Sequence, residues 1–256
     1  MAILHPCFTL FAMIKKYLWS ILLLIPYTMA GMTYYISPLG DDAQSGLSTA
    51  QAWQTINKVN LFSFLPGDTI LFEGGQTFTG NLVFSAPNSG TPAQPIVIDS
   101  YGTGRATLSS TNGTGILLAE VEGMEIRNLN IVGTQSPYND GIGILIRTAV
   151  FRPNRLKHFF IDEVEVSGFA YGGILGVNNE LGSLSEVGFE DVRFTNVRSH
   201  HNGNHGISVI GKVPPSGSGH AHKNIYVGFC QADFNRGLPA ITWTHSGNGI
   251  MIGNTD

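Results

Sequence analysis

The stretch SHHNGNHG, Ser199–Gly206, groups side chains that can do chemistry. It contains His200, His201 and His205, three of the eight histidines in a chain of 256 residues. Imidazole can transfer protons near neutral pH and can bind metal ions. Histidine and asparagine are also common on exposed turns, where they bond backbone groups. Proton transfer, metal binding and a structural turn are therefore three competing hypotheses, and the scaffold that carries the stretch must decide among them.

Metal binding has weak support in the spacing of the candidate ligands. The sequence has no Cys-x-x-Cys or His-Glu-x-x-His pattern of the kind that zinc sites use. Calcium prefers oxygen ligands, which Asp41, Asp42 and Asp233 can supply. Asp41 and Asp42 also stand in a Gly-Asp-Asp sequence that is typical of a turn before a helix. Calcium at these aspartates is thus an expectation that competes with a structural role, and no other cofactor is expected.

The composition indicates an all-β protein outside the nucleic-acid-binding classes. The chain has 14 basic and 18 acidic residues, a net charge of −4, and no basic stripe that would attract a nucleic acid. Only 12% of the residues are charged, and 32 are glycine. Low charge and abundant glycine are typical of secreted all-β proteins with many turns.

The N-terminus has the three parts of a secretory signal peptide. Lys15 and Lys16 precede the apolar run 17–27, and the small-residue sequence TMA after it forms a cleavage site. We predict a signal peptide over residues 1–30, with Met13 as an alternative start, and a secreted mature protein. The apolar run is shorter than a membrane span requires, which argues against stable membrane insertion. An uncleaved N-terminal anchor is the alternative.

A short helix is predicted near the start of the mature chain. Ser48 and Gln51, three residues apart, form a capping-box pattern, and Trp53 and Ile56 follow at helical spacing. The pattern predicts a helix from about Ala50 to Val59. Short strands are predicted after it, at 69–72, 81–84 and 95–101.

The rest of the chain contains a repeat of short strands. Four segments align at spacings of 35, 33 and 33 residues, namely 125–133, 160–168, 193–201 and 226–234. Their apolar columns are Ile126, Ile161, Phe194 and Val227; Leu129, Val164, Val197 and Cys230; and Ile131, Val166, Ser199 and Ala232. Each segment leads through a turn to a second strand that opens with Gly-Ile. Short strands repeated without helices indicate a solenoid of parallel strands whose stacked coils share one core.

Asparagines mark a bend within the repeat. Asn128 and Asn196 occupy the same column, where the chain must turn inward. Asparagine tolerates a left-handed backbone, and a buried asparagine can bond the next coil. Glu163 and Phe229 stand in the same column, so an asparagine ladder at this position would be discontinuous.

The sequence resembles the bacterial right-handed parallel β-helix proteins related to pectate lyases and chondroitinase B-like enzymes. The resemblance rests on the opening YYISPLGDDAQSGLS and on the repeat VRFTNVRSHHNGNHGISVI. It covers roughly residues 33–256 and implies an all-β, right-handed parallel β-helix with a short N-terminal capping helix. We expect residues 31–66 to form the cap and residues 67–256 the β-helix. We expect the β-helix to be incomplete at the C-terminus, because the chain stops at a strand with no cap after it.

The resemblance also implies a substrate groove along the Gly-Ile strands and the turns at their ends. Five histidines and two lysines then converge at the edges of the strand 206–210, and alternation makes Ser208 face the groove. The candidates for catalysis are His200, His201, His205, Lys223 and Arg236. The candidates for substrate binding are Asn178, Asn179, Ser208, His220, His222 and Trp243. The neighbours of Ser208 on adjacent coils are apolar, so any chemistry must come from the turns or from further coils.

The leading functional hypothesis is a secreted polysaccharide lyase that acts on an acidic polysaccharide. Such a lyase needs a base that takes the proton at C5 of a uronic acid and a cation that stabilises the resulting enolate. The alternatives are a non-catalytic, polysaccharide-binding or adhesin-like surface β-helix, and a glycoside hydrolase whose catalytic coils are missing. A long groove suits a polymer in each case, so the fold alone does not separate them.

Overall fold

The computed structural model describes residues 30–134, 140–150, 153–177, 188–211, 219–237 and 247–253. Gly31–Asp256 form one compact unit. The predicted signal peptide, apart from Ala30, and the candidate residues Asn178, Asn179 and Trp243 lie outside the described residues. Within the described ranges, no helix is long and apolar enough to cross a membrane.

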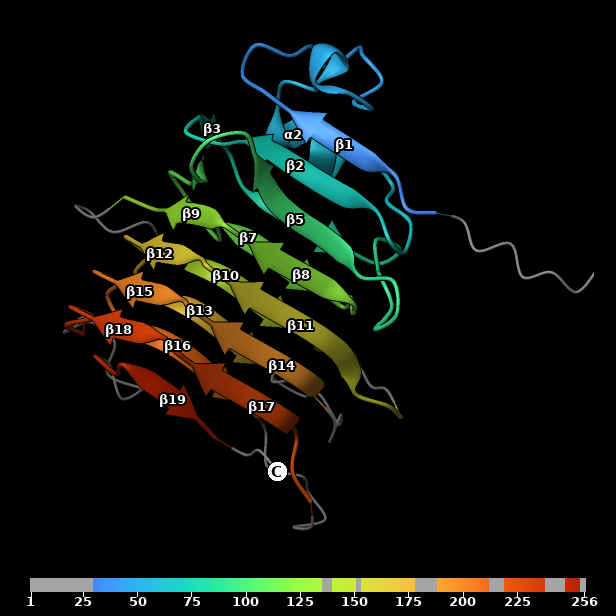
Figure 1. Ribbon diagram of the computed structural model, residues 1–256. Helices are drawn as coiled ribbons and strands as arrows, with labels where there is room; N and C mark the ends of the chain where they lie inside the picture. Colours follow the sequence, from blue (N-terminus) through green and yellow to red (C-terminus); the bar gives the residue numbers. More distant parts are fainter. Residues whose placement is uncertain are drawn as a thin grey trace, which may run out of the picture. The chain divides into compact units, whose positions relative to one another are not determined.

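Three parallel sheets form this unit (Figure 1). Sheet A contains β1 (Thr33–Ile36), β2 (Thr69–Glu73), β5 (Ile96–Tyr101), β8 (Met124–Arg127), β11 (Leu156–Asp162), β14 (Phe189–Thr195) and β17 (Lys223–Gly228), in that order. Sheet B contains β3 (Thr77–Thr79), β6 (Ala106–Ser109), β9 (Leu129–Val132), β12 (Glu165–Ser167), β15 (Arg198–His200) and β18 (Gln231–Asp233). Sheet C contains β4 (Leu82–Ser85), β7 (Ile116–Ala119), β10 (Ile142–Arg147), β13 (Gly172–Val177), β16 (His205–Ile210) and β19 (Ile250–Ile252).

From β2 to β19 the chain visits the sheets in the fixed order A, B, C, so successive strand triplets are the coils of a parallel β-solenoid. This confirms the predicted β-helix. The strand register confirms two of the predicted columns. One joins Ile126, Ile161, Phe194 and Val227, and the other joins Ile131, Val166, Ser199 and Ala232.

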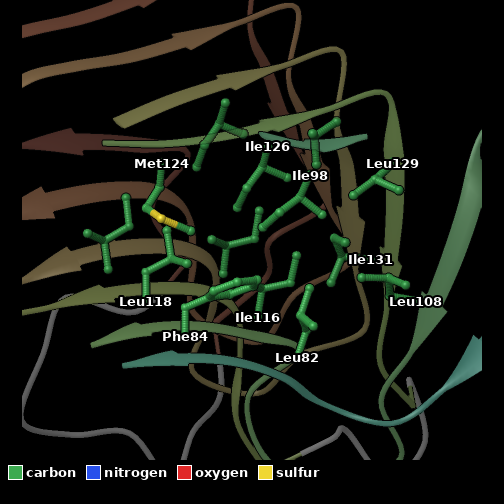
Figure 2. Packing of buried hydrophobic residues seen from close by; sticks show 14 of the residues in the cluster. Leu82, Phe84, Ile98, Leu108, Ile116, Leu118, Met124, Ile126, Leu129 and Ile131 are labelled. Atoms are coloured by element: carbon green, nitrogen blue, oxygen red, sulfur yellow. The ribbon is translucent and has the colours of Figure 1, made fainter. Parts of the chain in front are cut away.

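The inward side chains of the three sheets share one apolar core (Figure 2). Ile126 of sheet A, Ile131 of sheet B and Ile116 of sheet C are all fully buried. Alternation along each strand sends every second side chain inward, so each coil supplies only a thin apolar layer. The layers become a core because the coils stack, and the stability of one coil therefore depends on its neighbours.

The bend between sheets A and B has a left-handed backbone in successive coils. Its φ values are 50° at Asn128, 53° at Glu163, 51° at Asn196 and 56° at Phe229. The predicted bend is therefore confirmed, and residue types other than asparagine adopt it as well. The expectation of a buried asparagine here is wrong, because Asn196 is exposed and its amide donates to Asp162 on the surface.

The predicted helix over 50–59 is wrong in its first half. A 3₁₀ turn, η1 (Thr49–Gln51), is followed by extended residues, and the α-helix α2 is short, Ile56–Asn60. Ser48 makes no capping hydrogen bond, whereas Thr55 accepts from the Lys58 N–H at 3.1 Å. The extended segment forms because Trp53 bridges to Ile36 of β1 and stacks on Tyr34, and this tertiary pairing outweighs the local helical pattern.

The helix α2 lies against β4, the first strand of sheet C. The Asn60 amide nitrogen donates to the Asn81 carbonyl at 2.8 Å, and its oxygen accepts from the Val83 N–H at 2.9 Å. One asparagine side chain therefore substitutes for a neighbouring strand at this edge. Unpaired strand edges favour aggregation, so this contact protects the sheet.

Candidate functional site

The asparagines of SHHNGNHG form a ladder inside the solenoid. Asn202 is fully buried, and its oxygen accepts from the Phe169 N–H at 3.1 Å in the preceding coil. Its backbone and amide N–H groups donate to the Asn235 oxygen of the following coil at 3.0 and 3.1 Å. Part of the stretch is therefore structural, and the buried asparagines that bond successive coils lie at the turn between sheets B and C, not at the A–B bend.

The two histidines before the ladder lie on the outer face of the solenoid. His200 ends β15, and its Nε2 lies 2.8 Å from Oε1 of Glu165 on the neighbouring β12. Its Nδ1 lies 2.7 Å from Nδ1 of His201. The His201 ring stacks on Phe234 of the next coil, with centroids 4.9 Å apart. A carboxylate and two imidazoles thus form a continuous hydrogen-bonded row, the Glu165–His200–His201 relay.

Hydrogen-bond valence limits the protonation states of this relay. If His200 donates from Nε2 to Glu165, a neutral His200 has an acceptor at Nδ1, and His201 must donate to it from its own Nδ1. His201 Nε2 is then an acceptor. A proton taken up there can be balanced by transfer of the Nδ1 proton to His200, whose positive charge would face the Glu165 carboxylate. The arrangement is suited to general acid–base chemistry.

Charged groups surround the relay on sheet B. Arg198 contacts both Glu165, at 3.7 Å, and Asp233, at 3.3 Å. Arg105 lies 3.8 Å from Glu165. Among the described residues, Nε of Arg198 and Oδ1 of Asp233 are buried without a hydrogen-bond partner. Arg236 is exposed and directly follows Asn235 at the same edge of the solenoid.

His205 and Ser208, the candidates within β16, are buried. His205 is 4% exposed, and burial lowers the pKa of its imidazole. Ser208 is 0% exposed, so the expectation that it faces an open groove is wrong. Its register neighbours Leu175 and Met251 are the apolar residues anticipated from the sequence.

The remaining candidates lie at the far end of β16. His222 is fully buried and stacks on Phe189 of sheet A, with centroids 5.1 Å apart. Its Nδ1 accepts from the Phe189 N–H at 3.1 Å. Exposed His220 and Lys223 flank it in the sequence. Six residues of strand span about 20 Å, so these side chains lie at the opposite end of β16 from His200, His201 and His205.

The three aspartates suggested for calcium do not form one site. Asp42 accepts from the Gln54 N–H at 2.8 Å and from the Thr55 hydroxyl at 2.6 Å, and Asp41 accepts from the Ala43 N–H at 2.9 Å. Asp233 lies in the last strand of sheet B, roughly 25–30 Å along the stack at about 4.8 Å per strand. No group of three or more His, Cys, Asp or Glu residues within the described chain could hold a metal ion.

A second cluster, in which one histidine lies between two carboxylates on sheet A, was not anticipated from the sequence. His158 is 9% exposed, and its Nε2 lies 2.9 Å from Oε1 of Glu125. Its Nδ1 lies 3.3 Å from Oδ2 of Asp191. Glu125, His158 and Asp191 follow one another at intervals of 33 residues, the period of the repeat, and this spacing is the signal that could have revealed them.

No family model matches the chain. A segment of 78 residues is 40% identical to a lacto-N-biosidase of Bifidobacterium longum subsp. longum, covering 29% of this chain and 5% of that protein. The solved structure of a GH136 lacto-N-biosidase from Eubacterium ramulus is similar with a TM-score of 0.52 and 19% identity, covering 94% of this chain and 42% of that one. A rhamnogalacturonan lyase is similar with a TM-score of 0.50 and 15% identity, covering 88% of this chain and 63% of that one.

The chain spans less than half the length of the Eubacterium enzyme and a small part of the Bifidobacterium enzyme. The structural likenesses show a β-helix fold that carbohydrate-active enzymes of two reaction types share. The predicted resemblance to β-helix proteins of the pectate lyase class is therefore confirmed at the level of the fold. Fold likeness leaves the reaction open, because one scaffold can carry several chemistries.

Proposed function

We propose that the protein is a secreted carbohydrate-active enzyme in which the Glu165–His200–His201 relay transfers a proton. The observation that carries this proposal is the pair of short contacts, 2.8 and 2.7 Å, that align a carboxylate and two imidazoles at the solenoid surface. The fold shared with glycan-processing enzymes supports a saccharide as substrate. The predicted signal peptide supports secretion.

The relay suits β-elimination on an acidic polysaccharide. His201 Nε2 takes the C5 proton of a uronic acid, the electron pair forms the C4–C5 double bond, and the C4–O bond breaks. The leaving oxygen takes a proton from solvent water, and the relay afterwards releases its extra proton to solvent. Transfer of the Nδ1 proton from His201 to His200 places the positive charge next to Glu165, and exposed Arg236 is a candidate partner for the substrate carboxylate.

Hydrolysis of a glycosidic bond is the second candidate, and the 40% identical segment of a lacto-N-biosidase favours it. Hydrolysis by most glycosidases needs two carboxyl groups, one of which must carry a proton. Glu165 and Asp233 are a carboxylate pair, but both contact Arg198, whereas the Glu165–His200–His201 relay supplies an imidazole that can act as a base. The geometry in the described coils therefore favours elimination. A non-catalytic polysaccharide-binding β-helix is the alternative without chemistry.

Two product assays separate these reactions. The purified protein is incubated with polygalacturonate, rhamnogalacturonan and a lacto-N-biose-terminated oligosaccharide, each with and without calcium. Elimination gives an unsaturated product that absorbs in the ultraviolet, whereas hydrolysis gives new reducing ends without that absorbance. The proposal predicts an unsaturated product from one of the acidic polymers. The absence of any product from all three substrates would contradict it and favour the binding protein.

Substitution of the relay tests the mechanism. His201→Ala should lower kcat/KM about 100-fold or more, the usual size of a general-base contribution. His200→Ala and Glu165→Gln should each lower it less, because they orient the base. Thr107→Ala, an outward position of β6 in the same sheet, is the matched control and should leave turnover unchanged. A His201→Ala protein that works at the wild-type rate would remove the relay from the mechanism.

A further inference from the structure

The outer face of sheet A carries a column of three large side chains. Phe160, Arg193 and Tyr226 are in register on β11, β14 and β17. The Arg193 guanidinium lies over the Phe160 ring, 4.7 Å from its centroid. Tyr226 is 48% exposed, so a large part of its aromatic surface faces solvent. Exposed aromatic rings with a polar end are common in binding surfaces.

The Tyr226 ring lies over Gly228 of the same strand. A Cβ atom built at Gly228 would lie 2.3 Å from the Tyr226 hydroxyl oxygen and 2.6 Å from two ring carbons. The ring therefore lies over its own strand, in space that a side chain at residue 228 would share. One face of the ring rests on the backbone, which leaves the other face available for a ligand.

Next to this ring, a carboxylate is held in place by two cationic or polar partners. Oδ1 of Asp191 accepts from Arg193 Nε at 2.9 Å, and Oδ2 lies 3.3 Å from His158 Nδ1. His158 is itself held by the buried Glu125. Because each partner has another contact, the acceptor and donor groups at this surface are oriented before any ligand arrives, which reduces the entropic cost of binding.

These groups surround a depression of about 410 Å³. It is lined by Asp191, Arg193, Thr195, Asn224, Ile225 and Tyr226. We propose that this depression is a binding site for a neutral sugar ring, separate from the relay on sheet B. The apolar face of a sugar can stack on Tyr226, while one hydroxyl group donates to Asp191 and a neighbouring hydroxyl accepts from Arg193.

The balance of charge selects a neutral sugar. Arg193 and Asp191 neutralise each other, so no net positive charge remains in the pair to compensate a uronate. Hydroxyl groups, which donate and accept, can contact both members without breaking the ion pair. The site does not depend on the proposed reaction, because it lies on a different sheet and uses none of the relay residues.

An NMR titration of the ¹⁵N-labelled protein tests this site. Lacto-N-biose, cellobiose and digalacturonic acid are added separately, and the amide signals of Thr195, Asn224 and Gly228 are followed. We expect saturable shifts with at least one neutral disaccharide, with a Kd on the order of 1 mM for so open a site. Tyr226→Ala should weaken this binding about tenfold or more. Phe229→Ala is the matched control, because Phe229 is 86% exposed in the same coil but does not line the depression.

The outcomes are distinct from those of the activity assay. Tyr226→Ala should turn over a short soluble substrate at the wild-type rate. His201→Ala should lose turnover but should still show the sugar-induced shift of the Gly228 amide signal. The site would be refuted by three results: no shift with either neutral sugar, equal affinity in Tyr226→Ala, or preferential binding of digalacturonic acid. A protein without catalytic activity that still shows the shifts would contradict the proposed reaction alone.

Discussion

The buried histidines His205 and His222 are expected to affect the stability of the fold, whereas the relay histidines are proposed to act in catalysis. Burial lowers the pKa of His205, and it also lowers the pKa of His222, where nearby Arg155 acts in the same direction and a hydrogen bond to Ile210 opposes it. An unfolded histidine has a pKa of about 6.5. Below that value the unfolded chain binds protons that the folded chain does not, so the free energy of unfolding should fall as the pH drops from about 6.5 toward the lower folded pKa values.

His205→Leu isolates this effect. Leucine has a similar volume, and the variant removes Nδ1, a buried nitrogen without a hydrogen-bond partner among the described residues. We expect the free energy of unfolding at about pH 7.5 to be nearly that of the wild type. Between about pH 7.5 and about pH 5, this free energy should fall less in the variant than in the wild type, as measured by urea unfolding at both pH values. An unchanged acid sensitivity would show that His205 does not contribute to it. Retained turnover in the same variant would argue against the sequence-based assignment of His205 to catalysis.

At the scale of elements, the asparagine ladder joins three coils at the B–C turn. Asn202→Ala leaves the Phe169 N–H without its partner inside the core and removes one of the two hydrogen bonds to the Asn235 oxygen. We expect a loss of about 3 kcal/mol in the free energy of unfolding, because unsatisfied buried polar groups are costly. Asn57→Ala, at an exposed position of α2, is the control and should change stability by less than about 0.5 kcal/mol. Equal losses in the two variants would deny the ladder its structural role.

The contact between α2 and β4 predicts a different consequence. Asn60→Leu removes both hydrogen bonds to the edge of β4 and leaves the Val83 N–H and Asn81 carbonyl unpaired. The expected result is faster aggregation at equal protein concentration, followed by light scattering, together with a stability loss of about 1–3 kcal/mol. Lys58→Leu, on the same helix, adds a similar apolar group without touching the edge. If both variants aggregate equally, surface hydrophobicity rather than the exposed strand edge is the cause.

At the scale of the whole molecule, the sequence predicts the inward positions that repeat from coil to coil. It does not predict local structure that depends on contacts between distant parts of the chain. The columns through Ile126 and Ile131 were predictable because each coil repeats the same inward positions. The helix before Ile56 was not, because Trp53 pairs with Ile36 across the fold. In the candidate site, His200 and His201 were predictable because they are adjacent in the sequence. Glu165 was not, because it lies 35 residues before His200 and reaches it only through the stacking of neighbouring coils.

Stacking also predicts a gradient of stability along the solenoid. Ile161 in β11 is 1% exposed and has a paired strand on each side, whereas Ile225 in β17 is only partly buried, and β17 pairs with β14 alone among the described strands. Because stability in a solenoid is a sum of interfaces between neighbouring coils, β17 should open at a lower free energy than β11. Amide hydrogen exchange should therefore be faster in β17 than in β11.

The conservative pair Ile161→Val and Ile225→Val measures the same gradient through packing. Each removes one methylene group, which costs about 0.5–1.5 kcal/mol in a well-packed core. The cost should approach the upper value at Ile161, where atoms of two neighbouring coils surround the side chain, and should fall below the lower value at Ile225. Equal costs with equal exchange rates would mean that the coil containing β17 is packed as tightly in solution as the middle of the stack, so that another surface must cover it.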